Sequence, residues 1–89
     1  MAKHKLDSYY LRKYGVPYSY YEKLWAEQNE KCALCKKPRK PGQKRFHLDH
    51  SHQNQKIRGI LCYYCNRRRV GQLTYDWAFR IAEYLYKYE

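Results

Sequence analysis

Two Cys-x-x-Cys motifs restrict what this chain can fold into more than any other feature. Cys32 and Cys35 form the first motif, Cys62 and Cys65 form the second, and residues 36 to 61 lie between them. Four thiolates from two such motifs suit tetrahedral zinc, which then has no open position for a substrate. We therefore predict a structural zinc ion that contributes to folding. Disulfides or free thiols are the alternatives.

The length of the chain makes such a zinc site useful. With 89 residues the sequence predicts one domain with a limited core, and natural domains near this size often add a metal or disulfides. The N-terminal residues are polar and charged, and no apolar run approaches the roughly 20 residues of a membrane span. We expect no membrane association and a reducing cytoplasm, where paired Cys-x-x-Cys motifs favour metal binding.

Local signals predict helices before and after the cysteine-bounded region. Residues 1–13 form a basic arm, either a short helix or disordered, which Gly15 and Pro17 separate from a helix over 18–28. That helix carries Tyr21, Leu24 and Trp25 on one face, which plain core packing explains. A last helix is predicted over 75–88. Its apolar face comprises Trp77, Ile81, Tyr84, Leu85 and Tyr88, and Thr74 is its candidate N-cap.

The region between the flanking helices predicts a β-hairpin followed by a helix. Apolar and polar residues alternate over 46–50, and 57–61 can pair with them across the polar loop 51–56. Gly59 in the second strand indicates a bulge or a close backbone approach. A helix then runs from Cys62 to about Val70 and ends at Gly71. The predicted fold is α+β, with one β-hairpin and flanking helices.

A second polar cluster lies inside this region and consists of Asp49, His50, His52 and Asn66. A carboxylate and an amide oxygen suit magnesium that retains several waters, and a nearby histidine can activate water. Asp49 and His50 are neighbours on a strand and would point to opposite faces unless the strand twists or bulges. Plainer explanations are a capping or salt-bridging Asp49, surface or zinc-binding histidines, and an ordinary helical Asn66.

The charge of the chain favours a polyanionic partner. Lys and Arg total 19 against 8 Asp and Glu, a formal net charge of +11. The basic residues gather near the motifs, and we expect six of them to contact DNA phosphates with little sequence preference. The alternative for the arginine run is a solvated helix face. The six candidates are Lys44, Arg45, Arg58, Arg67, Arg68 and Arg69.

The sequence Asp-His-Ser-His at 49–52, followed by Ile-Arg-Gly-Ile-Leu-Cys-Tyr-Tyr-Cys-Asn at 57–66, resembles the phage recombination endonuclease VII family. That family belongs to the HNH, or ββα-metal, nucleases. The similarity extends to Tyr-Gly-Val-Pro at 14–17 and Lys-Cys-Ala-Leu-Cys at 31–35, and covers about residues 14 to 85. The resemblance implies a single HNH domain over 1–89, with a zinc-stabilised ββα-metal core at 32–70.

The resemblance also implies roles for individual residues. Asp49 and Asn66 would bind the catalytic Mg²⁺ or Mn²⁺, His50 would be the general base, and His52 would contact the scissile phosphate. Cys32, Cys35, Cys62 and Cys65 would bind zinc. The implied activity is one-metal hydrolysis of DNA phosphodiester bonds, by nicking or double-strand cleavage, that leaves 5′-phosphate and 3′-hydroxyl ends. The metal would stabilise the leaving 3′ oxygen.

Departures from the family pattern shape the remaining expectations. Asn66 stands where the broader HNH superfamily usually has histidine, as in the endonuclease VII-like variant. The family's long C-terminal extension has no counterpart up to Glu89, so we expect a nicking or non-specific nuclease, and a monomer rather than a dimer. If phage-encoded, it would act in the host cell cytoplasm. The alternatives are a non-catalytic zinc-stabilised nucleic-acid-binding module and a zinc-stabilised protein-interaction module.

Overall fold

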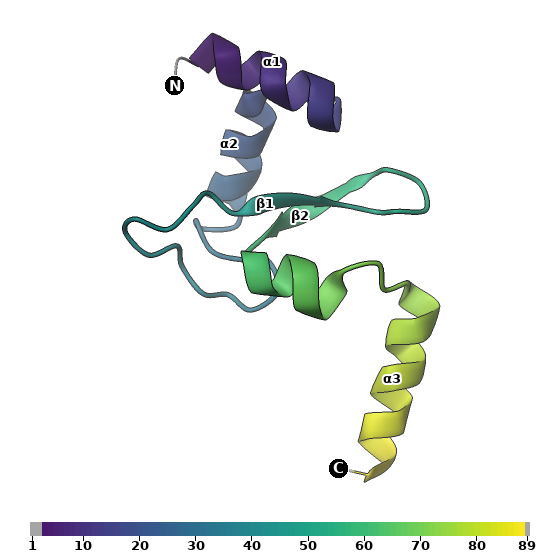
Figure 1. The fold of residues 1–89 in the computed structure, drawn as a ribbon. Coiled ribbons are helices and arrows are strands. Elements are labelled where there is room, and N and C mark those ends of the chain that lie inside the picture. Colours follow the sequence, from purple (N-terminus) through teal and green to yellow (C-terminus); the bar gives the residue numbers. More distant parts are fainter. Residues whose placement is uncertain (1–2, 89) are drawn as a thin grey trace.

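Two N-terminal helices form the upper part of the molecule in Figure 1. The computed structural model describes residues 3–88, with side chains from residue 5 onward. Helix α1 spans Lys3–Tyr14 and α2 spans Tyr18–Glu27, close to the predicted 18–28. Residues 3–13 of the predicted arm are therefore helical, and residues 1 and 2 lie outside the described part. Leu6 and Tyr10 of α1 are buried, so this helix belongs to the core.

An acidic residue of α1 caps the start of α2. Pro17 occupies the N-cap position and has no side chain that can accept a hydrogen bond. The backbone N–H of Tyr18 instead donates to Asp7 Oδ1 at 2.9 Å. An N–H at the start of α2 that has no partner within its own helix is thereby satisfied by α1. The same hydrogen bond links the two helices.

Aromatic side chains join these helices to the hairpin. The Tyr21 hydroxyl donates to the backbone carbonyl oxygen of Phe46 at 2.7 Å, and burial raises the pKa of this phenol. The rings of Trp25 and Phe46 meet edge to face, with centroids 5.4 Å apart. The face predicted from Tyr21, Leu24 and Trp25 is thus part of the core, or packed against it.

The hairpin consists of β1, His47–His50, and β2, Ile57–Leu61, paired antiparallel. Leu48 lies opposite Ile60, and both are buried. Figure 1 shows the hairpin between α2 above and the next helical segment below. The molecule is therefore a small α+β fold around a two-stranded sheet, as predicted.

The helical segment after β2 is wider than an α-helix. Residues 63 and 64 are α-helical, and η1, Cys65–Val70, is a π-helix. The Gly71 N–H donates to the carbonyl oxygen of Asn66, five residues earlier, at 2.9 Å. A helix ending at Gly71 was predicted, but its π geometry was not. Gly71 has φ of 48°, a conformation that suits glycine.

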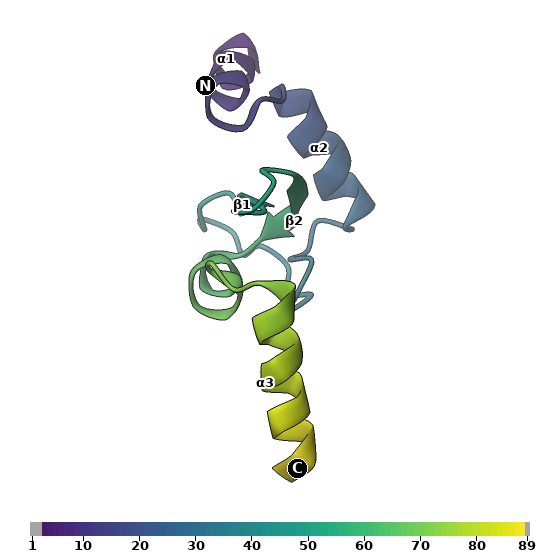
Figure 2. The same ribbon diagram turned by 90° about the vertical axis from the view of Figure 1, so that its right-hand side faces the viewer.

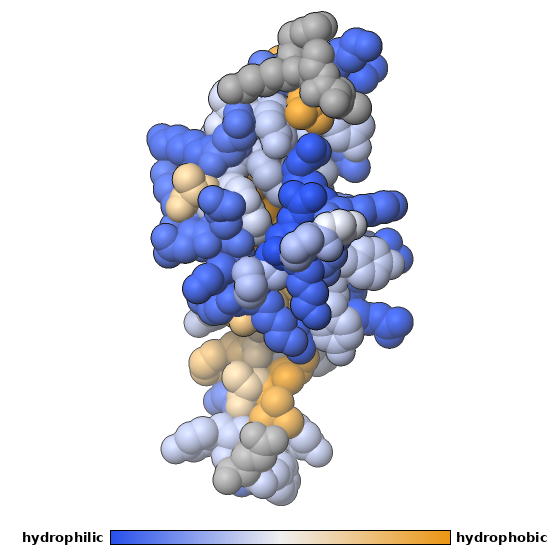
Figure 3. Space-filling model, turned by 90° about the vertical axis from the view of Figure 1, so that its left-hand side faces the viewer, coloured by the Kyte–Doolittle hydropathy of each residue, from blue (hydrophilic) through white to orange (hydrophobic). Residues whose placement is uncertain are grey.

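Helix α3, Tyr75–Tyr88, extends away from the rest of the molecule (Figures 1 and 2). The predicted cap is confirmed, because the Trp77 N–H donates to Thr74 Oγ1 at 3.3 Å. The predicted apolar face is exposed, with Trp77 at 57% and Tyr84 at 65%. Figure 3 shows apolar residues gathered on this lower part. Over residues 3–88, no helix combines the length and the apolar character that crossing a membrane requires.

Candidate functional site

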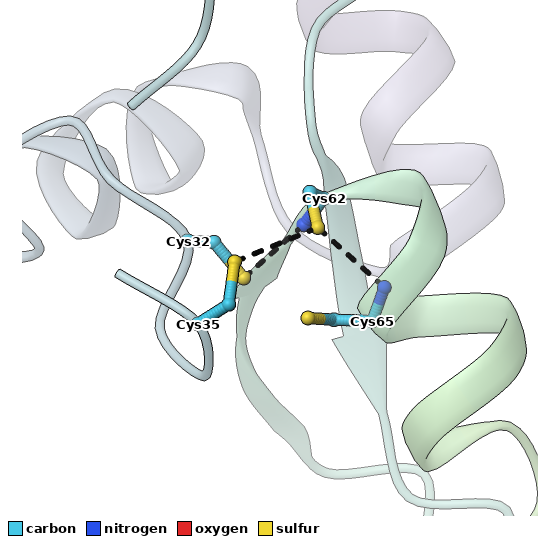
Figure 4. Close-up of side chains that lie close together, drawn as sticks. All are labelled: Cys32, Cys35, Cys62 and Cys65. Atoms are coloured by element: carbon cyan, nitrogen blue, oxygen red, sulfur yellow. Dashed lines mark hydrogen bonds between the residues drawn. The ribbon is translucent and has the colours of Figure 1, made fainter. Parts of the chain in front are cut away.

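The four cysteines converge on one point where the first motif, the end of β2 and the start of η1 meet (Figure 4). Their sulfur atoms all lie within 4.8 Å of one another, and Cys35 Sγ and Cys62 Sγ are 3.9 Å apart. A tetrahedral zinc with Zn–S bonds of 2.3 Å separates its sulfurs by about 3.8 Å, whereas a disulfide requires about 2.05 Å. The cysteines are free, and the cluster fits a zinc site.

Hydrogen-bond donors around the cluster favour thiolates. The N–H of Cys62 donates to Cys32 Sγ at 3.4 Å, and Arg69 Nη1 donates to Cys65 Sγ at 3.1 Å. Burial by itself raises the pKa of the Cys32 thiol, but backbone donors from Cys35, Cys62 and Leu34 outweigh it and lower that pKa to about 6. Burial raises the pKa of Cys65 to about 12, against the effect of Arg69. Such donors orient and stabilise metal-bound sulfurs.

A β-bulge in β2 lies opposite the step from Asp49 to His50. Asp49 lies opposite Gly59 and His50 lies opposite Ile57, so Arg58 is the extra residue. Asp49 is 6% exposed and receives both hydrogen bonds of a bidentate pair, from Arg58 Nε at 2.6 Å and Arg58 Nη2 at 3.0 Å. The bulge lies next to Gly59, which itself pairs with Asp49 and closely approaches Gln28. Asp49 is in a salt bridge with Arg58, as one of the plainer explanations had it.

The second polar cluster surrounds a single hollow of about 420 Å³ between β1 and η1. The rings of His50 and His52 lie 5.3 Å apart, centroid to centroid. Asn66 follows directly after the buried Cys65, so the cysteine cluster holds the turn that carries it. The lining of the hollow comprises all four residues of the second polar cluster, Asp49, His50, His52 and Asn66, together with Leu48, Arg67, Gly71 and Gln72.

The donors in this hollow suit a sparsely liganded hard cation. Asp49 and Asn66 offer two oxygen ligands, and magnesium commonly keeps several waters when the protein supplies so few. Within residues 3–88, the cysteines are the only group of three or more His, Cys, Asp or Glu donors close enough for a metal. A cation in the hollow would therefore rely on water or on a substrate oxygen for its remaining ligands.

The arginines of η1, predicted to contact DNA, have different surroundings. Arg67 lines the hollow, and its guanidinium lies 5.5 Å from the ring centroid of Tyr63. Arg69 donates to the Cys65 sulfur and lies over Tyr64, so it belongs partly to the cysteine cluster. Arg68 is exposed.

The other predicted DNA contacts are distributed over the hairpin and its approach. Arg58 pairs with Asp49. Arg45 stacks over Tyr18, 5.2 Å from the ring centroid, and hydrogen-bonds with Tyr10, so it helps to join β1 to the N-terminal helices. Lys44 is exposed and lines a separate groove beside α1.

Sequence reasoning missed the role of Gln28 in supporting the hairpin. Its side chain accepts from the Ile60 N–H at 2.9 Å and donates to the Ile60 carbonyl oxygen at 3.0 Å. The amide therefore satisfies the backbone of β2 as a further strand would. The available signal in the sequence was the position of Gln28, a polar residue at the end of the apolar face of α2.

Comparisons with known proteins agree with these features. A family model described as recombination endonuclease VII matches residues 7–87. The Gene 59 proteins of Mycobacterium phage L5 and Mycobacterium phage D29 are each 31% identical over 61 residues. That region is 68% of this chain, but 37% of the L5 protein and 36% of the D29 protein, so the chain spans little more than a third of these relatives. No solved structure matches.

Proposed function

The chain belongs to the recombination endonuclease VII family, and we propose that it is a metal-dependent DNA endonuclease of the HNH, or ββα-metal, type. The observation that carries the proposal is the convergence of Asp49, His50, His52 and Asn66 on one hollow beside the cysteine cluster. The hairpin and η1 would form the ββα core, with the four cysteines holding zinc.

The proposed reaction is hydrolysis of a phosphodiester bond. Asp49 and Asn66 would hold Mg²⁺ or Mn²⁺, which supplies charge stabilisation at the leaving 3′ oxygen. His50 would take a proton from the attacking water as its oxygen adds to phosphorus. The bond from phosphorus to the 3′ oxygen would then break, leaving a 5′-phosphate and a 3′ oxygen that takes up a proton from solvent to become a hydroxyl. His52 and Arg67, which line the same hollow, would contact the negatively charged phosphate.

The grouping of the site residues favours this reaction over simple nucleic-acid binding. A carboxylate at a phosphate-binding surface repels its ligand unless a cation lies between them. Arg58 supplies one positive charge to the buried Asp49, so charge alone also fits a salt-bridging Asp49 in a binding module. His50, His52 and Asn66 around the same hollow are what a nuclease needs and a binding module does not. Because phage proteins are among the relatives, we propose host-cell DNA or phage DNA in the cytoplasm as the substrate.

Incubation of supercoiled plasmid with zinc-loaded protein tests the proposal. We expect nicked plasmid with Mg²⁺ or Mn²⁺ and none with EDTA, because the cation supplies the charge stabilisation. The control is Asp49→Ala, in which Mg²⁺ or Mn²⁺ should no longer produce nicked plasmid. Retarded but uncut plasmid under every ion condition would favour the zinc-stabilised binding module and contradict the nuclease.

A further inference from the structure

A second hollow, of about 340 Å³, lies between α1 and the segment that leads into β1. We call it the α1 groove. None of its described lining residues is acidic, and four are basic. The basic lining residues are Lys13, Arg39, Lys44 and Arg45.

The charges in the α1 groove are held by neutral partners. Lys13 Nζ donates to the Tyr9 hydroxyl at 3.1 Å, and Arg39 Nε donates to the carbonyl oxygen of Gln43 at 2.8 Å. A neutral acceptor orients a cation without cancelling its charge. The groove therefore keeps a positive potential that attracts phosphate.

The α1 groove is linked to the proposed active site by a short chain of side chains. His47 lines the groove, and its ring centroid lies 6.3 Å from that of Tyr63. On the other side, Arg67 of the active-site hollow lies over the same Tyr63 ring. Tyr63 therefore contacts a side chain from each of the two hollows.

The spacing fits one nucleic-acid strand. His47 and His50 are the two ends of β1 and are separated by three residue steps. A strand rises about 3.3 Å per residue, so the separation is about 10 Å. Each nucleotide of a DNA strand advances about 3.4 Å along the helix axis, and the backbone path is longer than this, so a segment of only a few nucleotides reaches from one hollow to the other.

We propose that the α1 groove, through Lys13 and Lys44, binds phosphates of the cleaved strand a few nucleotides from the scissile bond. This inference rests on the proposed nuclease function. It assigns to α1 a part in substrate binding, and it adds Lys13 to the phosphate-contacting residues. Exposed Tyr63 lies along the path and would contact the sugar or base between the two positions.

Salt-dependent binding to a duplex in EDTA tests the groove without cleavage. Each phosphate contact contributes about 0.9 to the slope of log affinity against log salt. We expect the double variant Lys13→Gln/Lys44→Gln to lower the slope by about 1.8. The matched control, Lys5→Gln/Lys23→Gln, removes the same charge from exposed positions that do not line the groove, and its slope should equal that of the wild type.

A length series separates a local contact from a general loss of charge. When the duplex is shortened stepwise, the difference between the groove variant and the wild type should disappear once the duplex is too short to reach both the active-site hollow and the groove, whereas a general loss of charge would give a difference at every length. If the wild type cleaves plasmid but both double variants have the same slope, the groove assignment is wrong and the nuclease stands. If the wild type neither binds nor cleaves DNA, both proposals fail.

Discussion

Asp49 is the residue on which structure and proposed chemistry depend most. Its carboxylate is buried, and Arg58 donates to both of its oxygens. A carboxylate has about four lone-pair sites, so a cation can share it with a bidentate arginine. Arg58 thus balances the negative charge of Asp49. A cation in the hollow would balance the same charge.

Removal of Arg58 should therefore destabilise the protein. Arg58→Ala leaves a buried carboxylate without its partner, and we expect a loss of about 1–3 kcal/mol in the free energy of unfolding. This loss is smaller than for a fully buried ion pair because the Arg58 side chain is 38% exposed. Urea denaturation of zinc-loaded protein measures the loss. The control Arg68→Ala, at an exposed position of η1, should change stability by less than about 0.5 kcal/mol.

Magnesium should reverse part of this loss, because the variant offers an unshared carboxylate. We expect millimolar Mg²⁺ to stabilise Arg58→Ala more than the wild type. Equal stabilities of Arg58→Ala and Arg68→Ala, with no effect of Mg²⁺, would show that Asp49 neither needs this partner nor binds the ion.

At the scale of elements, the cysteine cluster holds together the first motif, β2 and η1. Zinc binds thiolates, so each thiol that is protonated in the free protein must release its proton on binding. Above about pH 6 the Cys32 thiol is already largely ionised, whereas Cys65, with a pKa raised to about 12, still carries its proton. Zinc binding near neutral pH should therefore release at least one proton and fewer than four.

The zinc affinity should accordingly rise with pH. Each released proton makes the apparent affinity about tenfold higher per pH unit, so we expect at least a tenfold rise from pH 6 to pH 7 and again to pH 8. Competition with a chromophoric chelator at each pH measures the affinity. An affinity that does not change over this range would contradict a cluster of thiol ligands.

Much of this arrangement could be predicted from the sequence. Spacing and turn residues predicted the hairpin, an irregularity near Gly59 and the helix that ends at Gly71, because these signals are local. The π geometry of η1 and the support of β2 by Gln28 were not predicted, because both depend on contacts between distant residues. Periodicity cannot indicate that an N–H will donate to the carbonyl oxygen five residues earlier. It also cannot indicate which backbone groups the side-chain amide of Gln28 will contact.

At the scale of the whole molecule, the candidate site lies between a packed half and a projecting half. The N-terminal helices pack on the hairpin, whereas α3 carries exposed Trp77, Ile81 and Leu85 away from it. Periodicity predicted the apolar face of α3, but a face is a property of one helix and does not identify what the helix packs against. The convergence of Asp49, His50, His52 and Asn66 was predicted from residue types and from the position of Asn66 directly after Cys65, whereas the role of each residue came only from the family resemblance.

We propose that His50 activates water in the hollow beside the cysteine cluster. Single-turnover cleavage of a short duplex by zinc-loaded wild type, His50→Ala and the loop control Gln53→Ala tests it most directly. We expect His50→Ala to cleave roughly 10²–10⁴-fold more slowly, with unchanged DNA affinity in EDTA and partial rescue by added imidazole, while Gln53→Ala matches the wild type. Cleavage by His50→Ala at the wild-type rate would contradict the claim.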